Sequence, residues 1–139
     1  MKFKQFSDRY FLRIDKREEI VETFKKFCYD SGIKAGFFQG IGSSNKLTIG
    51  CYNTGEKNFY KKDFEGEYEI TNISGNISTF NGETYIHMHT NFSGTDYISY
   101  GDHLNSEVVS GTYEMAVIRS DGKIERVFDE DTGLNIYLF

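Results

Sequence analysis

Hydrophobic residues recur with two different periods, and the N-terminal part of the chain shows both. Within residues 6–14, Tyr10, Leu12 and Ile14 occupy every second position, as expected for a strand with one buried face. The pattern therefore predicts an opening strand over residues 6–14.

The next segment predicts the main helix of the chain. Asp15 is a suitable N-cap, and Glu18 three positions later completes a capping-box spacing. Gly32 supplies a C-terminal stop. One apolar face at helical spacing lies between these signals and consists of Ile20, Val21, Phe24, Phe27 and Cys28. We expect Cys28 to be a buried, structural side chain.

After Gly32 the chain consists of short segments rich in Phe, Tyr, Ile and Thr, separated by Gly, Asn and Asp. This texture is typical of a sheet built from hairpins. Asn81 and Gly82 give the strongest hairpin signal, because a type I′ turn needs positive φ at both central positions. The predicted strands are residues 35–41, 46–53, 58–63, 68–80, 84–92, 107–118 and 124–128.

The length of 139 residues is that of one domain. No internal repeat or long linker divides the chain. We therefore expect a single α+β domain over residues 1–139, with a mostly antiparallel sheet packed on one main helix.

The charge balance bears on the partners of the chain. Sixteen Lys or Arg against 21 Asp or Glu give a net charge of -5, which on average repels a phosphate backbone. No apolar run is long enough to span a membrane. From this we expect a cytoplasmic location and no membrane partner. Cys28 and Cys51 lie outside any CxxC spacing, so we expect reduced thiols.

All three histidines of the chain fall close together in the sequence, at His87, His89 and His103. In a strand, residues 87 and 89 point to the same face, so two imidazoles already converge. His103 follows two glycine-bearing turns, and a return strand could bring it to the pair. The cluster predicts a metal site.

Three neutral imidazoles suit zinc or another divalent ion, with a fourth position left for water or another ligand. The alternative is that His87 and His89 are polar residues on a half-exposed strand and that His103 lies in a loop. Because ligating histidines often donate to a carboxylate, Asp102, Asp96 and Glu114 are candidate supporting groups. Each of these acids can also be read as a solvated surface residue.

Gly40 and Gly42 form a GxG motif after a predicted strand, which invites comparison with phosphate-binding loops. The third glycine of a dinucleotide fingerprint is missing, and the following KLTIGCY has the pattern of a strand. We therefore interpret the motif as a tight turn or bulge in a curved sheet.

Several short motifs follow one another between residues 13 and 118: FLRIDKREEIVETFKKF, GIGS, GEYEI, SGNIS, HMH, GDHL and VVSGTYEMAV. In this order and spacing the chain resembles the PPC domain, which is found in plants and prokaryotes and is also known as domain of unknown function 296. The form is that of a stand-alone prokaryotic member.

The resemblance implies a strongly twisted, largely antiparallel sheet packed against helix and assembled as a homotrimer. In prokaryotic members the HxH pair and the later GHL histidine look like ligands of a metal ion, usually taken as zinc, near the subunit interface. These positions correspond to His87, His89 and His103. In plants the domain accompanies DNA-binding AT-hook motifs, and prokaryotic members are often described as DNA-binding by analogy.

The sequence departs from the plant pattern in three ways. An AT-hook core needs a proline, and this chain has none. Glu67 stands where the plant GRFEIL segment has arginine, and Asp102 replaces the second glycine before the GHL histidine. These acidic substitutions argue against strong autonomous DNA binding. The remaining expectation is that the chain associates with DNA or a nucleoprotein complex through other proteins.

Three functions are consistent with these features. The first is a regulatory or DNA-associated module that binds a metal or a small-molecule ligand. The second is a zinc-dependent hydrolase or lyase, in which Glu114 or Asp102 carries a proton for a metal-bound water. The third is a purely structural metal that tightens the trimer, for which a fourth ligand would have to come from a neighbouring subunit or solvent.

Overall fold

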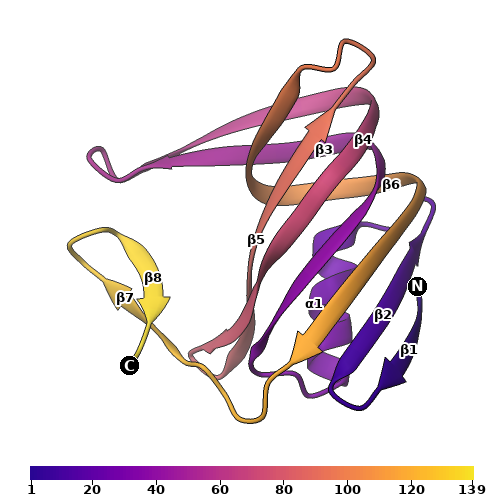
Figure 1. The fold of residues 1–139 in the computed structure, drawn as a ribbon. Coiled ribbons are helices and arrows are strands. Elements are labelled where there is room, and N and C mark those ends of the chain that lie inside the picture. The colour runs from indigo at the N-terminus through magenta and orange to yellow at the C-terminus, as the bar shows by residue number, and fades with distance from the viewer.

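The computed structural model describes residues 1–139 as eight strands and one helix, α1 (Figure 1). Every pairing between strands is antiparallel. The helix does not meet the length and apolar character that crossing a membrane requires. The elements are β1 (Lys2–Phe6), β2 (Arg9–Asp15), α1 (Ile20–Asp30), β3 (Gly36–Asn53), β4 (Asn58–Phe80), β5 (Glu83–Ser93), β6 (Ser99–Arg119), β7 (Arg126–Asp129) and β8 (Leu134–Tyr137).

The main sheet has the strand order β1-β2-β6-β3-β4-β5, and β5 pairs in addition with β6. Strands β3, β4, β5 and β6 thereby form a closed ring of hydrogen-bonded neighbours, while β2 and β1 extend from β6. The β7–β8 hairpin is a separate two-stranded sheet. This single domain with a mostly antiparallel sheet and one helix confirms the predicted α+β class.

Helix α1 lies against one face of the sheet (Figure 1), and it packs there through aromatic contacts. The ring of Phe24 lies 4.5 Å from that of Phe38 on β3, and the ring of Phe27 lies 5.4 Å from that of Tyr10 on β2. Cys28, on the same apolar face, is fully buried as predicted. Burial of each large side chain contributes about 1.5 to 3 kcal/mol, so this helical face is a major source of stability.

The helix begins later than the capping-box spacing predicted. Glu19 is the N-cap, and its side chain accepts a hydrogen bond from a backbone N–H of the first turn. The backbone N–H of Asp15 instead donates to Glu18 over 2.7 Å, and Glu18 also pairs with the terminal ammonium of Met1 at 2.7 Å. The predicted N-cap at Asp15 is therefore wrong, whereas the stop at Gly32, with φ 63°, is confirmed.

The predicted strands are present, but several are longer or joined. Residues 35–41 and 46–53 belong to the single strand β3, and residues 58–63 and 68–80 belong to β4. The Asn81-Gly82 turn is confirmed, with φ values of 51° and 82°. The predicted opening strand is preceded by β1, because the chain turns at Ser7, and β8 was not predicted. Strand β6 begins at Ser99, before the predicted start at residue 107.

The GxG motif lies within β3, where the pairing register shifts between Gly40 and Gly42. A Cβ atom at Gly42 would collide with the ring of Tyr113, so this close approach of the backbone requires glycine. A second shift lies between Ser44 and Lys46, and β3 changes direction sharply along its length (Figure 1). The interpretation as a bulge in a curved sheet is confirmed.

Glu107 is a fully buried acid in the core. The hydroxyl of Tyr113 donates to its Oε2 over 3.4 Å, and its Oε1 has no partner. Burial raises the pKa of Glu107 from 4.5 to about 8, so its carboxyl is neutral at pH 7.

This buried carboxyl predicts a specific pH dependence of stability. Below the ordinary pKa of 4.5, Glu107 is protonated in both the folded and the unfolded chain. As pH rises from 4.5 to about 8, the unfolded chain loses the proton first and the free energy of unfolding falls, by on the order of a few kcal/mol in total. Urea unfolding should show this fall in the wild type and a smaller one in Glu107→Gln.

Glu65→Gln provides the control, because the Glu65 side chain is 73% exposed. Its free energy of unfolding should follow the wild type at every pH. Equal pH slopes for Glu107→Gln and the wild type would show that Glu107 does not carry this penalty.

Candidate metal centre

Strands β5 and β6 bring the three histidines together. His87 and His89 point to one face of β5, while Met88 and Thr90 point to the other and are buried. His103 lies on β6 directly opposite His89 in the register. The strand interpretation of His103 is therefore confirmed over the loop interpretation.

The ring nitrogens of the three histidines converge on one point. The Nε2 of His87 lies 2.9 Å from that of His103 and 3.2 Å from that of His89. Nitrogens bound about 2.05 Å from one tetrahedral zinc ion are roughly 3.3 Å apart. The three histidines therefore have the donor type and spacing of a metal-binding set and could hold a metal ion.

The surroundings keep two of these imidazoles neutral. Burial, and then the neighbouring His103, His89 and Arg126, lower the pKa of His87 to about 4. Burial and His103 lower the pKa of His89, and Asp102 opposes this effect. A neutral imidazole offers the lone pair that a metal requires. Because His89 is exposed while the other two are partly buried, the centre is accessible from one side.

Asp102 adjoins this centre. Its Oδ1 accepts the backbone N–H of His103 over 2.9 Å and lies 3.6 Å from the Nδ1 of that ring. The His103 Nδ1 is buried and has no hydrogen-bond partner. Asp102 also raises the pKa of the exposed Cys51 thiol, so Cys51 lies near the centre as well. No spacing in the sequence pointed to Cys51.

The other two candidate acids are not brought to the histidines. Asp96 accepts the backbone N–H of Ile98 in the turn between β5 and β6. Glu114 lies at the other end of β6, opposite Arg13 and Ile41 in the register, and lines a cavity on a different part of the sheet. The structure therefore provides no contact between either acid and the imidazoles.

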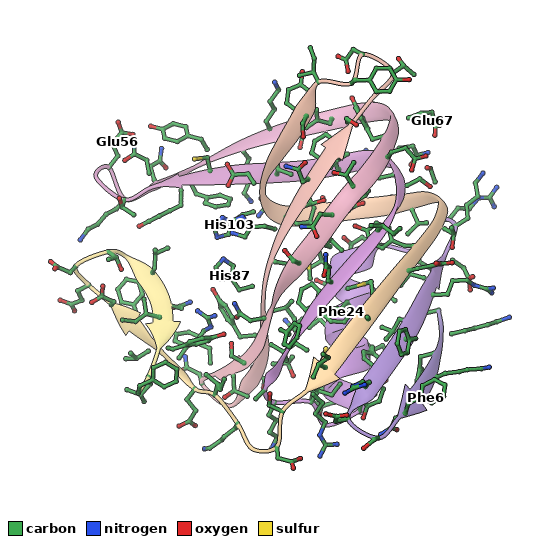
Figure 2. The ribbon with its side chains drawn as sticks, in the orientation of Figure 1. Phe6, Phe24, Glu56, Glu67, His87 and His103 are labelled. Carbon is green, nitrogen blue, oxygen red and sulfur yellow. The ribbon has the colours of Figure 1, made fainter.

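The C-terminal hairpin contributes a residue near the centre that the sequence analysis missed. Arg126 on β7 donates from Nε to Ser78 over 2.8 Å and from Nη2 to Asn76 over 2.7 Å. Asn76 pairs with His87 across β4 and β5. Figure 2 shows His87 and His103 on the side of the sheet that faces the β7–β8 hairpin.

The far end of this hairpin is attached to the long β3–β4 hairpin. The hydroxyl of Tyr52 donates to the carbonyl of Thr132 over 3.1 Å, and Lys57 donates from Nζ to the carbonyl of Glu130. The β7–β8 hairpin is therefore held at both ends, at β4 through Arg126 and at β3–β4 through these bonds.

The domain matches a described family over most of its length. The family profile of the Plants and Prokaryotes Conserved (PCC) domain matches residues 1–121. The comparison with curated proteins finds no match.

Several solved structures share the fold. A crystal structure of a candidate DNA-binding protein from Bacteroides thetaiotaomicron has a TM-score of 0.97 and 35% identity, covering 99% of this chain and 96% of that chain. A metal-containing protein from Archaeoglobus fulgidus has a TM-score of 0.88 and 32% identity over 100% of both chains. A plant- and prokaryote-conserved (PPC) protein from Pyrococcus horikoshii has a TM-score of 0.86 and 26% identity, covering 99% of this chain and 94% of that chain.

Proposed function

The chain belongs to the Plants and Prokaryotes Conserved domain family, as its motifs predicted, and we propose that it is a homotrimeric metal-binding module with a regulatory role. The observation that carries this proposal is the convergence of three imidazole nitrogens between β5 and β6. His87, His89 and His103 are the proposed ligands. Zinc or another divalent ion is the proposed metal, with a position left for water or a small-molecule ligand.

The chemistry of the donor set supports zinc over calcium or magnesium. Three neutral nitrogen donors suit zinc and similar transition metals, whereas calcium and magnesium prefer oxygen ligands. The relative from Archaeoglobus fulgidus is named as metal-containing. When bound, the metal would polarise a ligand or water at the position left open by the protein.

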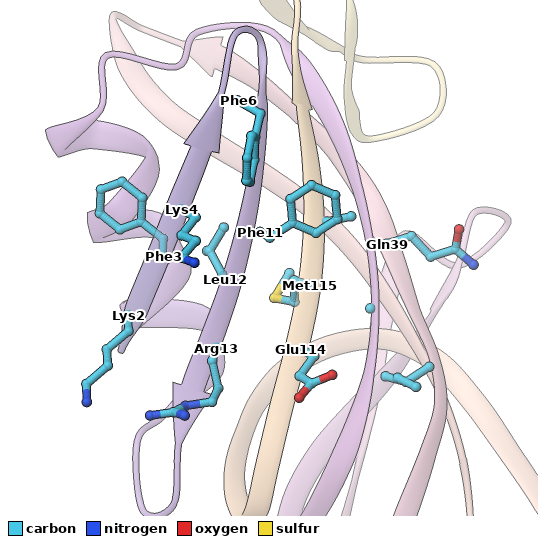
Figure 3. Close-up of a pocket in the computed structure, with 13 residues that line it drawn as sticks. Lys2, Phe3, Lys4, Phe6, Phe11, Leu12, Arg13, Gln39, Glu114 and Met115 are labelled. Carbon is cyan, nitrogen blue, oxygen red and sulfur yellow. The ribbon is translucent and has the colours of Figure 1, made fainter.

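An exposed apolar surface supports the homotrimer. Phe11 alternates with the buried Tyr10 and Leu12, so it points away from α1. Figure 3 shows Phe11 near Phe6 on this face, where both line an open cavity of about 750 Å³. Phe6 is 59% and Phe11 54% exposed. Contiguous apolar surface of this kind is typical of a protein interface.

The charges around this surface also favour assembly of identical subunits. Lys2, Lys4 and Arg13 line the apolar cavity together with a single acid, Glu114. A separate cavity of about 660 Å³ is lined by Glu67 and Glu69. A closed ring of three subunits needs two different surfaces that fit each other, and a basic rim and an acidic groove meet this requirement.

We propose that any association with DNA depends on a partner protein. The Bacteroides relative is named a candidate DNA-binding protein, but this chain carries a net charge of -5. The two free cysteines are in keeping with a cytoplasmic location, which is part of the proposal.

The proposal on DNA predicts no retardation of a DNA duplex by the purified protein at low salt, where electrostatic binding is strongest. The measurement is a gel retardation assay at increasing protein concentration. A salt-sensitive shift by the protein alone would contradict it.

A second candidate is a zinc-dependent hydrolase or lyase. It is favoured by the exposed side of the centre at His89 and by Asp102, whose Oδ1 lies 3.6 Å from the His103 ring, so its carboxylate is a candidate to carry a proton for a metal-bound water. The hydrolase form of this candidate is set aside if the zinc-loaded wild type cleaves a p-nitrophenyl ester no faster than zinc-treated His89→Ala. A metal that only tightens the trimer is the third candidate.

Removal of one imidazole should abolish metal binding. Elemental analysis of untagged protein should find close to one zinc per chain in the wild type and less than about a tenth of that in His89→Ala, because two remaining ligands hold the ion far more weakly. Glu114→Gln is the control and should retain the metal, since Glu114 lies away from the histidines.

The mass of the assembly, measured on the same samples, distinguishes a metal that is accessible to ligands from a metal with a purely structural role. A trimer that persists in His89→Ala supports a site for ligands, whereas loss of metal and trimer together supports the structural role. No zinc in the wild type after addition and dialysis would contradict the proposed metal site.

The apolar surface should be required for assembly. Phe11→Glu places a charge at its centre and should convert the trimer to monomer in light scattering, because the charge would have to be buried in the interface. Phe128→Glu is the control, since Phe128 is 55% exposed on β7. Equal masses for Phe11→Glu and the wild type would exclude this surface from the interface.

A further inference from the structure

Arg126 is a partly buried cation that no carboxylate neutralises. Its three hydrogen bonds go to Ser78, to Asn76 and to the carbonyl of Asn135, all of which are neutral. None of the ion pairs in the chain includes Arg126. Since partial burial of a charge without a counter-charge is unfavourable, an anion from outside the chain would be stabilised at Arg126.

The guanidinium is held in one position beside the metal centre. Its Cζ lies 4.8 Å from the ring centroid of Tyr85 and 4.4 Å from that of Tyr137. Tyr85 lies two residues before His87, on the same face of β5. Asn76, which accepts the hydrogen bond from Nη2, is the cross-strand partner of His87. The charge of Arg126 also contributes to lowering the pKa of His87.

Arg126 keeps donors free for a ligand. A guanidinium has five N–H groups, and the three hydrogen bonds leave one on each terminal nitrogen without a partner in the chain. Such a planar, fixed pair of donors matches the two oxygens of a carboxylate.

We propose that the centre binds a small carboxylate-bearing anion, with its carboxylate on Arg126 and a second oxygen directed to the metal of His87, His89 and His103. The inference rests on the proposed metal site for the second contact, whereas the contact with Arg126 needs only the chain itself. The exposed face of His89 gives such a molecule access.

The surrounding charges favour a small anion over a nucleic acid strand. Asp129 at the end of β7 is followed in the loop to β8 by Glu130 and Asp131. This loop is tied to the β3–β4 hairpin through Lys57, so these acids stay close to the same side of the molecule. A polyanion would be repelled along this loop, whereas a molecule with one or two carboxylates can avoid it.

The test is calorimetric titration of succinate into the zinc-loaded protein at low salt, with zinc content checked before and after. We expect saturable binding by the wild type and at least tenfold weaker binding by Arg126→Gln. Lys123→Gln removes the same charge from an exposed pair with Glu125 and should bind within twofold of the wild type. Equal affinity of Arg126→Gln and the wild type, or no binding by the wild type, would overturn the inference.

Arg126 also anchors the C-terminal hairpin, so Arg126→Gln removes structural contacts as well as the contact with the ligand. A second measurement therefore uses the wild type. In the wild type, the Nε–H resonance of Arg126 should shift as succinate is added, and its assignment follows from its absence in Arg126→Lys. A resonance that stays unchanged at saturating succinate would overturn the inference.

Two further outcomes are decisive. If the histidines bind no zinc but succinate binding still depends on Arg126, the proposed metal function fails and the Arg126 contact stands. Inorganic phosphate that binds at Arg126 more tightly than succinate would overturn the assignment of the ligand as a carboxylate.

Discussion

The pairing of β5 with β6 is the interaction on which the candidate site depends. It closes β3, β4, β5 and β6 into a ring and places His103 directly opposite His89. Without this pairing, β5 would be an edge strand carrying two imidazoles with no third donor. The same backbone hydrogen bonds therefore stabilise the sheet and bring the donor set together.

Opposite faces of the same strands have different roles. On β5, Met88 and Thr90 are buried while His87 and His89 face the centre. On β2, Tyr10 and Leu12 pack into the core while Phe11 is left on an exposed apolar surface. Because side chains alternate across a strand, one sheet can supply a core, a polar centre and a surface for assembly.

The C-terminal hairpin extends the polar centre beyond the residues that match the family profile, which end at 121. Arg126 ties this hairpin to β4 and lies between two tyrosine rings. Because Arg126 is already fixed, it loses little further conformational freedom when an anion binds. The entropy cost that offsets the electrostatic attraction is therefore small. The hairpin therefore adds charge to a centre in which burial lowers the pKa values of His87 and His89.

Local patterns in the sequence determined the helical face with Phe24 and Cys28, the Asn81-Gly82 turn, and the shared face of His87 and His89. These features follow from bonds between near neighbours and from the periods of helix and strand. Tertiary structure alone decided that Asp15 does not cap the helix, that Glu114 lies away from the histidines, and that Arg126 lies beside them. Such positions depend on the register between distant strands and on side-chain contacts between them, which the spacing of residues along one segment does not specify.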